Sequence, residues 1–138
     1  MTAYLDSSVL LRLVLGQRDR LKEWKSVRQG VASALAEVEC LRTLDRLRIA
    51  RGLKDEEVAR RREAVFRLLD EVEVVEAGRP VLTRAAQPFP TPLGTLDAIH
   101  LATALLWRER SDTDIVMATH DTALGMAARA SGFRVIGV

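Results

Sequence analysis

One stretch organises the chain: Thr95-Leu96-Asp97-Ala98-Ile99-His100-Leu101-Ala102-Thr103-Ala104-Leu105-Leu106. It predicts a helix with few polar residues before Arg108, and a helix of this kind is usually buried. Thr95 is the expected N-cap, because a loop rich in proline over residues 88–94 precedes it. Asp97 lies near the start of this helix, where a carboxylate is costly unless it is paired, hydrogen-bonded or bound to a metal. The rest of the chain must supply what compensates Asp97.

The composition is that of one ordinary globular domain over residues 1–138. Apolar residues make up 48% of the chain and charged residues 29%, a balance typical of soluble domains that are large enough for a core. No segment is long and apolar enough to span a bilayer, and the N-terminus lacks a signal-peptide pattern. Cys40 is the one cysteine, and we expect it in the core rather than as a nucleophile. A lone cysteine favours a reducing compartment, so the sequence predicts a cytoplasmic protein.

Positive charge is concentrated in one half of the chain. The net charge is only +2, but 15 of the 21 Lys and Arg residues lie between Arg12 and Arg67. A basic face of this kind suits a polyanionic partner such as nucleic acid. Solvated helix surfaces are the commoner explanation of such a run, and charge alone does not decide between the two.

Short apolar strands alternate with helices along the chain. Expected strands cover residues 3–5, 31–33, 72–75, 114–119 and 133–136. Expected helices lie between Asp6 and Gly16 and over residues 19–28, 34–50, 55–69 (capped by Asp55), 79–87, 95–106 and 122–131. This alternation favours a mostly parallel central sheet of four to five strands with helices on both faces, a single α/β/α domain.

Four acids are the candidate functional residues. Asp6 ends the first strand and Asp121 follows the strand over residues 114–119, so both belong to the carboxyl edge, where sites form in open parallel sheets. The helix that begins near Asp97 can return to the same edge. Glu39 is the fourth candidate, and it shares one polar stripe of its helix with Arg42 and Arg46.

Each acid has an ordinary explanation when it is taken alone. Asp6, Asp97 and Asp121 lie near helix N-termini, where an acid stabilises the helix by capping and through the dipole. Glu39 alone fits an ion pair with a neighbouring arginine of its helix. Capping does not explain four acids that this topology can bring to one edge, because their repulsion would demand a cation. Ligands that are all oxygen favour Mg²⁺ or Mn²⁺ over zinc.

Such a cluster has a known chemical use. Divalent ions held by carboxylates orient a phosphodiester, activate the attacking water and stabilise the leaving oxygen. Two hydroxyl residues, Ser8 and Thr119, are candidates for orienting the acids or a water. Three arginines are candidates for contacting phosphate charge: Arg12, Arg42 and Arg46. The basic half of the chain would then hold the polynucleotide.

Four motifs of the sequence match the pattern of one known protein family. The first is Tyr4-Leu5-Asp6-Ser7-Ser8-Val9-Leu10-Leu11, and the second is Ser33-Ala34-Leu35-Ala36-Glu37-Val38-Glu39-Cys40-Leu41-Arg42. The third is Leu96-Asp97-Ala98-Ile99-His100-Leu101-Ala102-Thr103-Ala104, the most specific of the set. The fourth is Thr119-His120-Asp121-Thr122-Ala123-Leu124, followed by Ala127-Ala128-Arg129-Ala130 and Gly132. In these motifs the sequence resembles the VapC toxins among the PIN-domain ribonucleases. The motifs follow that family's order and reach from end to end of the chain.

The resemblance implies a PIN fold with an acidic metal site formed by Asp6, Glu39, Asp97 and Asp121. It further implies endonucleolytic cleavage of RNA that depends on Mg²⁺ or Mn²⁺, a homodimer, and inhibition by a cognate VapB-type antitoxin. Glu39 fits the family's spacing better than Glu37, which projects to a different side of the helix. Ser7-Ser8 replaces the Thr-Asn of many relatives, and a hydroxyl there can still donate and accept.

Three other residues have less specific readings. His100 lies one helical turn after Asp97, and an Asp-x-x-His pair can bind metal; we expect instead a core histidine that is hydrogen-bonded locally. His120 lies beside Asp121, where it could approach a substrate. Trp24 is expected in packing or in a protein interface rather than in catalysis.

Two other functions compete with the ribonuclease. One is a catalytically inactive PIN-like module that holds RNA or a protein, and the complete acidic set argues against it. The other is a phosphotransfer or phosphatase domain with Asp6 as nucleophile. It is disfavoured because no Asp-x-Asp follows the first strand and no lysine follows Lys54.

Overall fold

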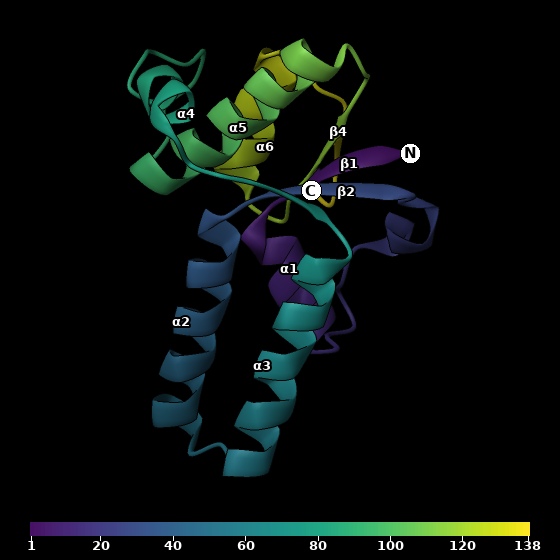
Figure 1. The fold of residues 1–138 in the computed structure, drawn as a ribbon, viewed down its shortest axis with the longest axis vertical. Helices are drawn as coiled ribbons and strands as arrows, with labels where there is room; N and C mark the ends of the chain where they lie inside the picture. Colours follow the sequence, from purple (N-terminus) through teal and green to yellow (C-terminus); the bar gives the residue numbers. More distant parts are fainter.

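A computed structural model describes residues 1–138 and has one central sheet of five parallel strands in the order β3-β2-β1-β4-β5 (Figure 1). The strands are β1 (Thr2–Leu5), β2 (Gln29–Ser33), β3 (Glu73–Val75), β4 (Val116–Ala118) and β5 (Val135–Ile136). All five expected strands are present, each within a few residues of its expected range. The predicted α/β/α class is confirmed.

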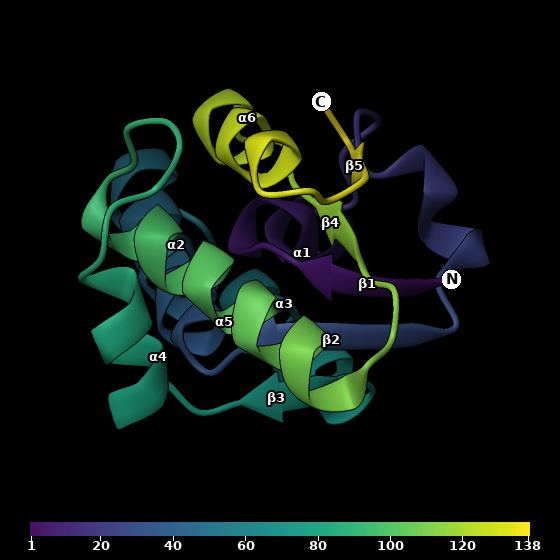
Figure 2. The same ribbon diagram turned by 90° about the horizontal axis from the view of Figure 1, so that it is seen from above.

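Six α-helices cover the two faces of the sheet. They are α1 (Ser7–Val14), α2 (Leu35–Arg51), α3 (Asp55–Asp70), α4 (Arg79–Ala85), α5 (Thr95–Ser111) and α6 (Thr122–Ala130). The first three lie on one face and the last three on the other (Figures 1 and 2). The paired helices α2 and α3 project well beyond the sheet (Figure 1), and Gly52 turns the chain between them with a φ of 60°. None of the helices has the length and apolar character needed to cross a membrane.

The strands are buried on both faces, which explains their nearly continuous apolar sequence. Successive strand residues point to opposite faces. Leu5, for example, packs in a cluster with α1, α2 and α3, whereas Tyr4 belongs to a second cluster with α5 and α6. Leu101 and Ala104 of α5 are fully buried in that second cluster. The helix around Asp97 is therefore a core helix, as its composition predicts.

The expected helix over residues 19–28 is wrong. Only a short 3₁₀ helix, η1 (Lys22–Ser26), forms there. Its apolar contacts to the core come from Leu21, Trp24 and Val27, a spacing of three residues that suits the three-residue turn of a 3₁₀ helix. The charged residues between them give no face wide enough for an α-helix to bury.

Two expected caps are displaced by one residue. Gly94 and Lys54 occupy the cap positions of α5 and α3, and neither Thr95 nor Asp55 caps through its side chain. Each is instead the first residue of its helix. Helix ends often vary by one residue, and Asp55 in the first turn still interacts favourably with the helix dipole.

The strand order places a topological switch point at the centre of the sheet. The chain leaves β1 toward β2 on one side, and β4 pairs with β1 on the other. The crevice between the carboxyl ends of β1 and β4 is the expected place for a site in such a sheet. Asp6 directly follows β1, and Asp121 lies in the short loop that follows β4.

Candidate active site

Asp6 is fixed in place by its backbone and by two hydroxyl groups. Its side chain follows β1 and is 5% exposed, and its backbone N–H donates to the carbonyl of Ala118 at 3.0 Å. The Oδ2 atom accepts hydrogen bonds from Ser8 Oγ at 2.7 Å and from Thr119 Oγ1 at 2.9 Å. Both hydroxyl groups therefore hold the Oδ2 side of this carboxylate.

The loops after β1 and β4 are locked together by the same hydroxyl groups. Ser8 Oγ accepts from the backbone N–H of His120 at 3.0 Å, and Thr119 Oγ1 accepts from the backbone N–H of Asp121 at 3.0 Å. Asp121 caps α6, since its Oδ1 accepts from the backbone N–H of Leu124 at 2.8 Å. The helix-capping explanation thus holds for one oxygen of Asp121. It does not hold for Asp6, whose side chain caps nothing.

Glu39 reaches the site from α2 and meets His100 from α5. His100 Nε2 donates to Glu39 Oε1 at 2.5 Å and lies 3.5 Å from Asp6 Oδ1. The Nδ1 atom of the same ring is 2.7 Å from the hydroxyl of Tyr4. The expected local hydrogen bond of His100 is wrong, because the buried helix turns the ring toward β1 and α2. Glu37 is exposed.

The pKa of Asp97 is affected by the charges of all three other acids. Burial and the charges of Asp121 and Asp6 raise the pKa of Asp97 to about 6; Glu39 adds to the shift and His100 opposes it. No arginine or lysine forms an ion pair with any of the four acids. The acids therefore share one electrostatic neighbourhood, and two of them, Asp6 and Glu39, lie beside His100.

The pKa of His100 also reflects the excess of negative charge at this site. Burial would lower it, but the hydrogen bond to Glu39 and the charges of Asp6, Glu39 and Asp97 raise it above its ordinary value. An imidazolium at this position would partly neutralise the acids. One such charge does not balance four carboxylates, so a further cation would be favoured here.

The donor set fits a hard divalent ion. All four candidate ligands are carboxylates, and oxygen ligands favour Mg²⁺ or Mn²⁺. No group of three or more His, Cys, Asp or Glu side chains is arranged to hold one ion between them. Mg²⁺ usually binds through one or two carboxylates and keeps several waters. A ligand set completed by water and phosphate suits this arrangement.

The three arginines expected to meet phosphate lie in different surroundings. Arg12 Nη1 forms an ion pair with Asp19 Oδ2 at 2.7 Å. Arg42 and Arg46 line a hollow of about 310 Å³ next to Glu39, and Arg46 donates to the hydroxyl of Thr43 at 2.9 Å. Arg42 and Arg46 thus lie on the same hollow as Glu39, whereas Arg12 is paired with Asp19.

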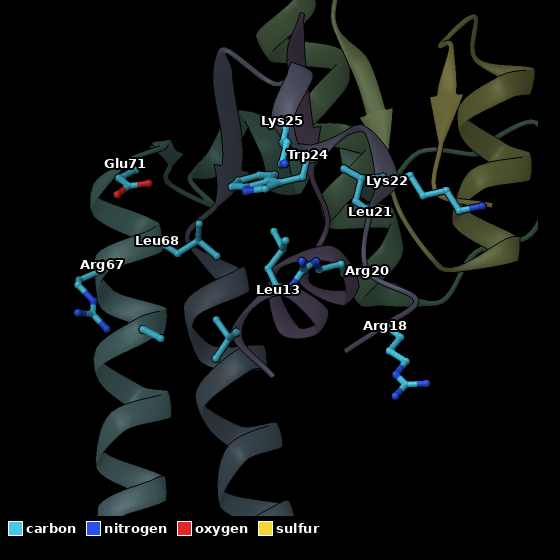
Figure 3. Close-up of a pocket in the computed structure, with 12 residues that line it drawn as sticks. Leu13, Arg18, Arg20, Leu21, Lys22, Trp24, Lys25, Arg67, Leu68 and Glu71 are labelled. Carbon is cyan, nitrogen blue, oxygen red and sulfur yellow. The ribbon is translucent and has the colours of Figure 1, made fainter. Parts of the chain in front are cut away.

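The largest hollow lies elsewhere, between α1, η1 and α3. This hollow, here called the Trp24 groove, has a volume of about 740 Å³ and is lined by Leu13, Val14, Arg18, Arg20, Leu21, Lys22, Trp24, Lys25, Ala64, Arg67, Leu68 and Glu71. Leu13, Leu68 and Trp24 point toward one another, whereas Arg18 and Lys22 point outward (Figure 3). None of its lysines and arginines forms an ion pair. The groove therefore combines an apolar floor with unpaired positive charge.

The raised pKa of Asp97 predicts how stability depends on pH without a divalent ion. Because its pKa of about 6 lies above the unfolded value, folding favours the protonated form. The protonated Asp97 carboxyl therefore contributes to the free energy of unfolding at low pH. This contribution is lost as the pH rises from about 4 to about 6. The Asp97→Asn variant should therefore gain stability over the wild type across this range, by about 1 kcal/mol after solvent screening. Urea unfolding of both proteins in chelator at several pH values measures this difference, and a difference that shrinks with rising pH contradicts the assignment.

Comparisons with known proteins come from both sequence and structure. Residues 3–129 match the PIN domain family. Ribonuclease VapC46 of Mycobacterium tuberculosis is 35% identical over 137 residues, which cover 96% of this chain and 95% of that protein. A toxin-antitoxin complex from Klebsiella pneumoniae contains a chain that aligns with a TM-score of 0.68, over 97% of this chain and 95% of that one, at 18% identity. The last likeness is one of fold.

Proposed function

Since the chain belongs to the PIN-domain family and to its VapC ribonucleases, we propose that it is the endoribonuclease toxin of a toxin–antitoxin pair and depends on Mg²⁺ or Mn²⁺. RNA is the substrate, and the cytoplasm is the compartment where such a toxin meets it. Asp6, Glu39, Asp97 and Asp121 are the proposed metal-binding and catalytic residues. The relatives' names support the ribonuclease class, whereas the metal and the residues are supported by the site itself.

One observation carries the proposal: four carboxylates share one neighbourhood at the switch point with no arginine or lysine paired to them. Burial and, after it, the charges of the other three acids raise the pKa of Asp97 to about 6. A structural role would not need this arrangement, because capping uses one acid at a time. A cation near this edge of the sheet would offset the charge of all four acids, even where only one or two of them bind it directly.

Each of these residues would have its own role in phosphodiester cleavage. A divalent ion bound here would supply an activated water and offset the charge that develops on the phosphate. Asp6, whose carboxylate accepts from two hydroxyl groups, would set the position of the site. Asp97 and Asp121 approach from the two neighbouring loop–helix junctions, and Glu39 closes the site from α2. Arg42 and Arg46, which line the hollow beside Glu39, would contact phosphates of the bound RNA.

The simplest test measures RNA cleavage with and without chelator. The proposal expects cleavage that is lost in chelator and restored by millimolar Mg²⁺ or Mn²⁺. The alternative function is that of a catalytically inactive PIN-like module that binds RNA or a protein. That alternative expects RNA binding without cleavage and no thermal stabilisation by either ion.

The Trp24 groove is the proposed surface for the antitoxin. An apolar floor with a positive rim fits an amphipathic protein segment whose polar side carries acids. Six apolar residues line the groove, which favours protein over the phosphate backbone of RNA, and the groove lies apart from the acids. The homodimer is a second proposed association, which light scattering of the free toxin can test.

Charge reversal in the groove should weaken antitoxin binding without changing catalysis. Lys22→Glu combined with Lys25→Glu should slow association with the cognate antitoxin about ten-fold at low salt, because unpaired rim charges steer encounter. RNA cleavage by the free toxin should be unchanged. Stopped-flow or surface-plasmon measurements give the association rate.

A matched double variant serves as the control. Arg51→Glu with Lys54→Glu makes the same change in charge at the exposed turn between α2 and α3, outside the groove. Equal slowing by both double variants would mean that only net charge matters and that the groove is not the surface.

A further inference from the structure

Tyr4 and His100 form a fully buried hydrogen-bonded pair directly behind the acids. We propose that this pair positions Glu39, by holding the His100 ring so that its Nε2–H points at the Glu39 carboxylate. The inference rests on the proposed function, since it gives Glu39 a role at the metal site. Neither residue would contact the ion or the RNA. Both are positioning residues.

The hydrogen bonds leave the ring little freedom. Carboxylates only accept, so His100 Nε2 must donate to Glu39 Oε1, 2.5 Å away. The remaining ring nitrogen, Nδ1, lies 2.7 Å from the Tyr4 hydroxyl, which can donate to it. Both side chains are 0% exposed, so water cannot replace either partner. A partner on the second ring nitrogen is the usual means by which proteins fix the orientation of a histidine.

Glu39 has no hydrogen-bond partner apart from this pair, unlike Asp6 and Asp121. Asp6 accepts from two hydroxyl groups and Asp121 accepts from a backbone N–H, whereas the one hydrogen-bond partner of Glu39 is His100. Glu39 also has the longest side chain of the four acids, because the other three are aspartates. Its free rotation would cost binding free energy each time the site forms. Its side chain is 20% exposed, beside the hollow that Arg42 and Arg46 line.

The pair also links the two layers of the protein. Tyr4 is on β1, two residues before Asp6, and its ring packs edge-on against His100 of α5 with 5.9 Å between ring centroids. His100 then reaches Glu39 on α2, a helix of the opposite layer. The position of α2, which projects from the sheet (Figure 1), is thereby tied to the first strand at the level of the acids.

Two substitutions of His100 separate positioning from packing. The amide nitrogen of Gln lies as many bonds from the backbone as His Nε2, so His100→Gln can still donate to Glu39. In His100→Asn the amide lies at the level of Nδ1, so the donor to Glu39 is lost. Both variants replace a buried ring and should lose similar stability. Only His100→Asn should lose Mn²⁺ affinity, about ten-fold or more, as measured by calorimetry or by the electron paramagnetic resonance of free Mn²⁺.

A double-mutant cycle tests whether His100 acts through Glu39. If it does, adding His100→Asn to Glu39→Gln should cause little further loss of Mn²⁺ affinity. Equal Mn²⁺ affinity in His100→Asn, His100→Gln and the wild type would overturn the positioning role, as would equal losses in both variants or fully additive losses in the cycle. In each of these cases wild-type cleavage and Mn²⁺ binding leave the proposed function standing. A wild-type protein that neither binds Mn²⁺ nor cleaves RNA overturns both.

Discussion

Asp97→Asn should reduce RNA cleavage by about a thousand-fold or more, because the change removes one of the acids that would hold the divalent ion. An ion that activates water and offsets phosphate charge is worth several kcal/mol in the transition state, and each 1.36 kcal/mol is about ten-fold in rate. The fold should survive. The raised pKa of Asp97, about 6, means that its charge is unfavourable in the free protein, so the variant should unfold at higher urea in chelator. Cleavage of a labelled RNA at saturating Mg²⁺ measures the loss.

Asp112→Asn is the matched control for this substitution. Asp112 is the residue that follows the other end of α5, and it is exposed with a φ of 48°. Asparagine tolerates this left-handed conformation well, so the control should fold and cleave like the wild type. Full cleavage by Asp97→Asn, at a rate equal to that of Asp112→Asn, would contradict the proposed site.

The second large effect is expected from the hydroxyl groups that orient Asp6. Ser8→Ala combined with Thr119→Val removes both donors to Asp6 Oδ2, and it also removes the two acceptors that join the loops after β1 and β4. A buried carboxylate without donors turns toward any it can reach. Groups that orient ligands usually contribute 10- to 100-fold in affinity or activity, so cleavage should fall by about this range.

The single variants indicate which bond matters. Thr119→Val should cost more than Ser8→Ala, because the Thr119 hydroxyl bonds are buried more deeply and water cannot replace them. Circular dichroism and urea unfolding give the accompanying loss of stability. A double variant that keeps wild-type cleavage would show that Asp6 does not need these donors.

The fold could be predicted well because strand and helix signals agreed along most of the chain. Apolar runs flanked by turn residues gave the strands, and Gly52 and Gly132 fell just beyond helix ends where their positive φ is needed. The failure at η1 has a clear cause. Leu21 and Trp24 look like one face of an α-helix over so short a span, and only their packing reveals the tighter turn.

The four acids could be proposed from sequence because three of them directly follow strand ends or begin a helix. The partners of His100 could not. Its spacing from Asp97 drew attention to a local or metal-binding role, yet its partners are Tyr4, which precedes it by 96 residues, and Glu39, which precedes it by 61. No periodicity in one sequence encodes a contact between α5, β1 and α2. The apolar residues next to Tyr4 in the sequence did not indicate that its hydroxyl forms a hydrogen bond with His100.

The most direct test of the central claim is a crystal structure of the protein soaked in Mn²⁺, with data collected at the manganese absorption edge. We predict an anomalous peak within coordination distance of Asp6 and at least one of Asp97, Asp121 and Glu39, and loss of that peak in Asp97→Asn or Asp6→Asn. An empty crevice between β1 and β4 in such crystals, together with RNA cleavage that persists in chelator, would contradict the account.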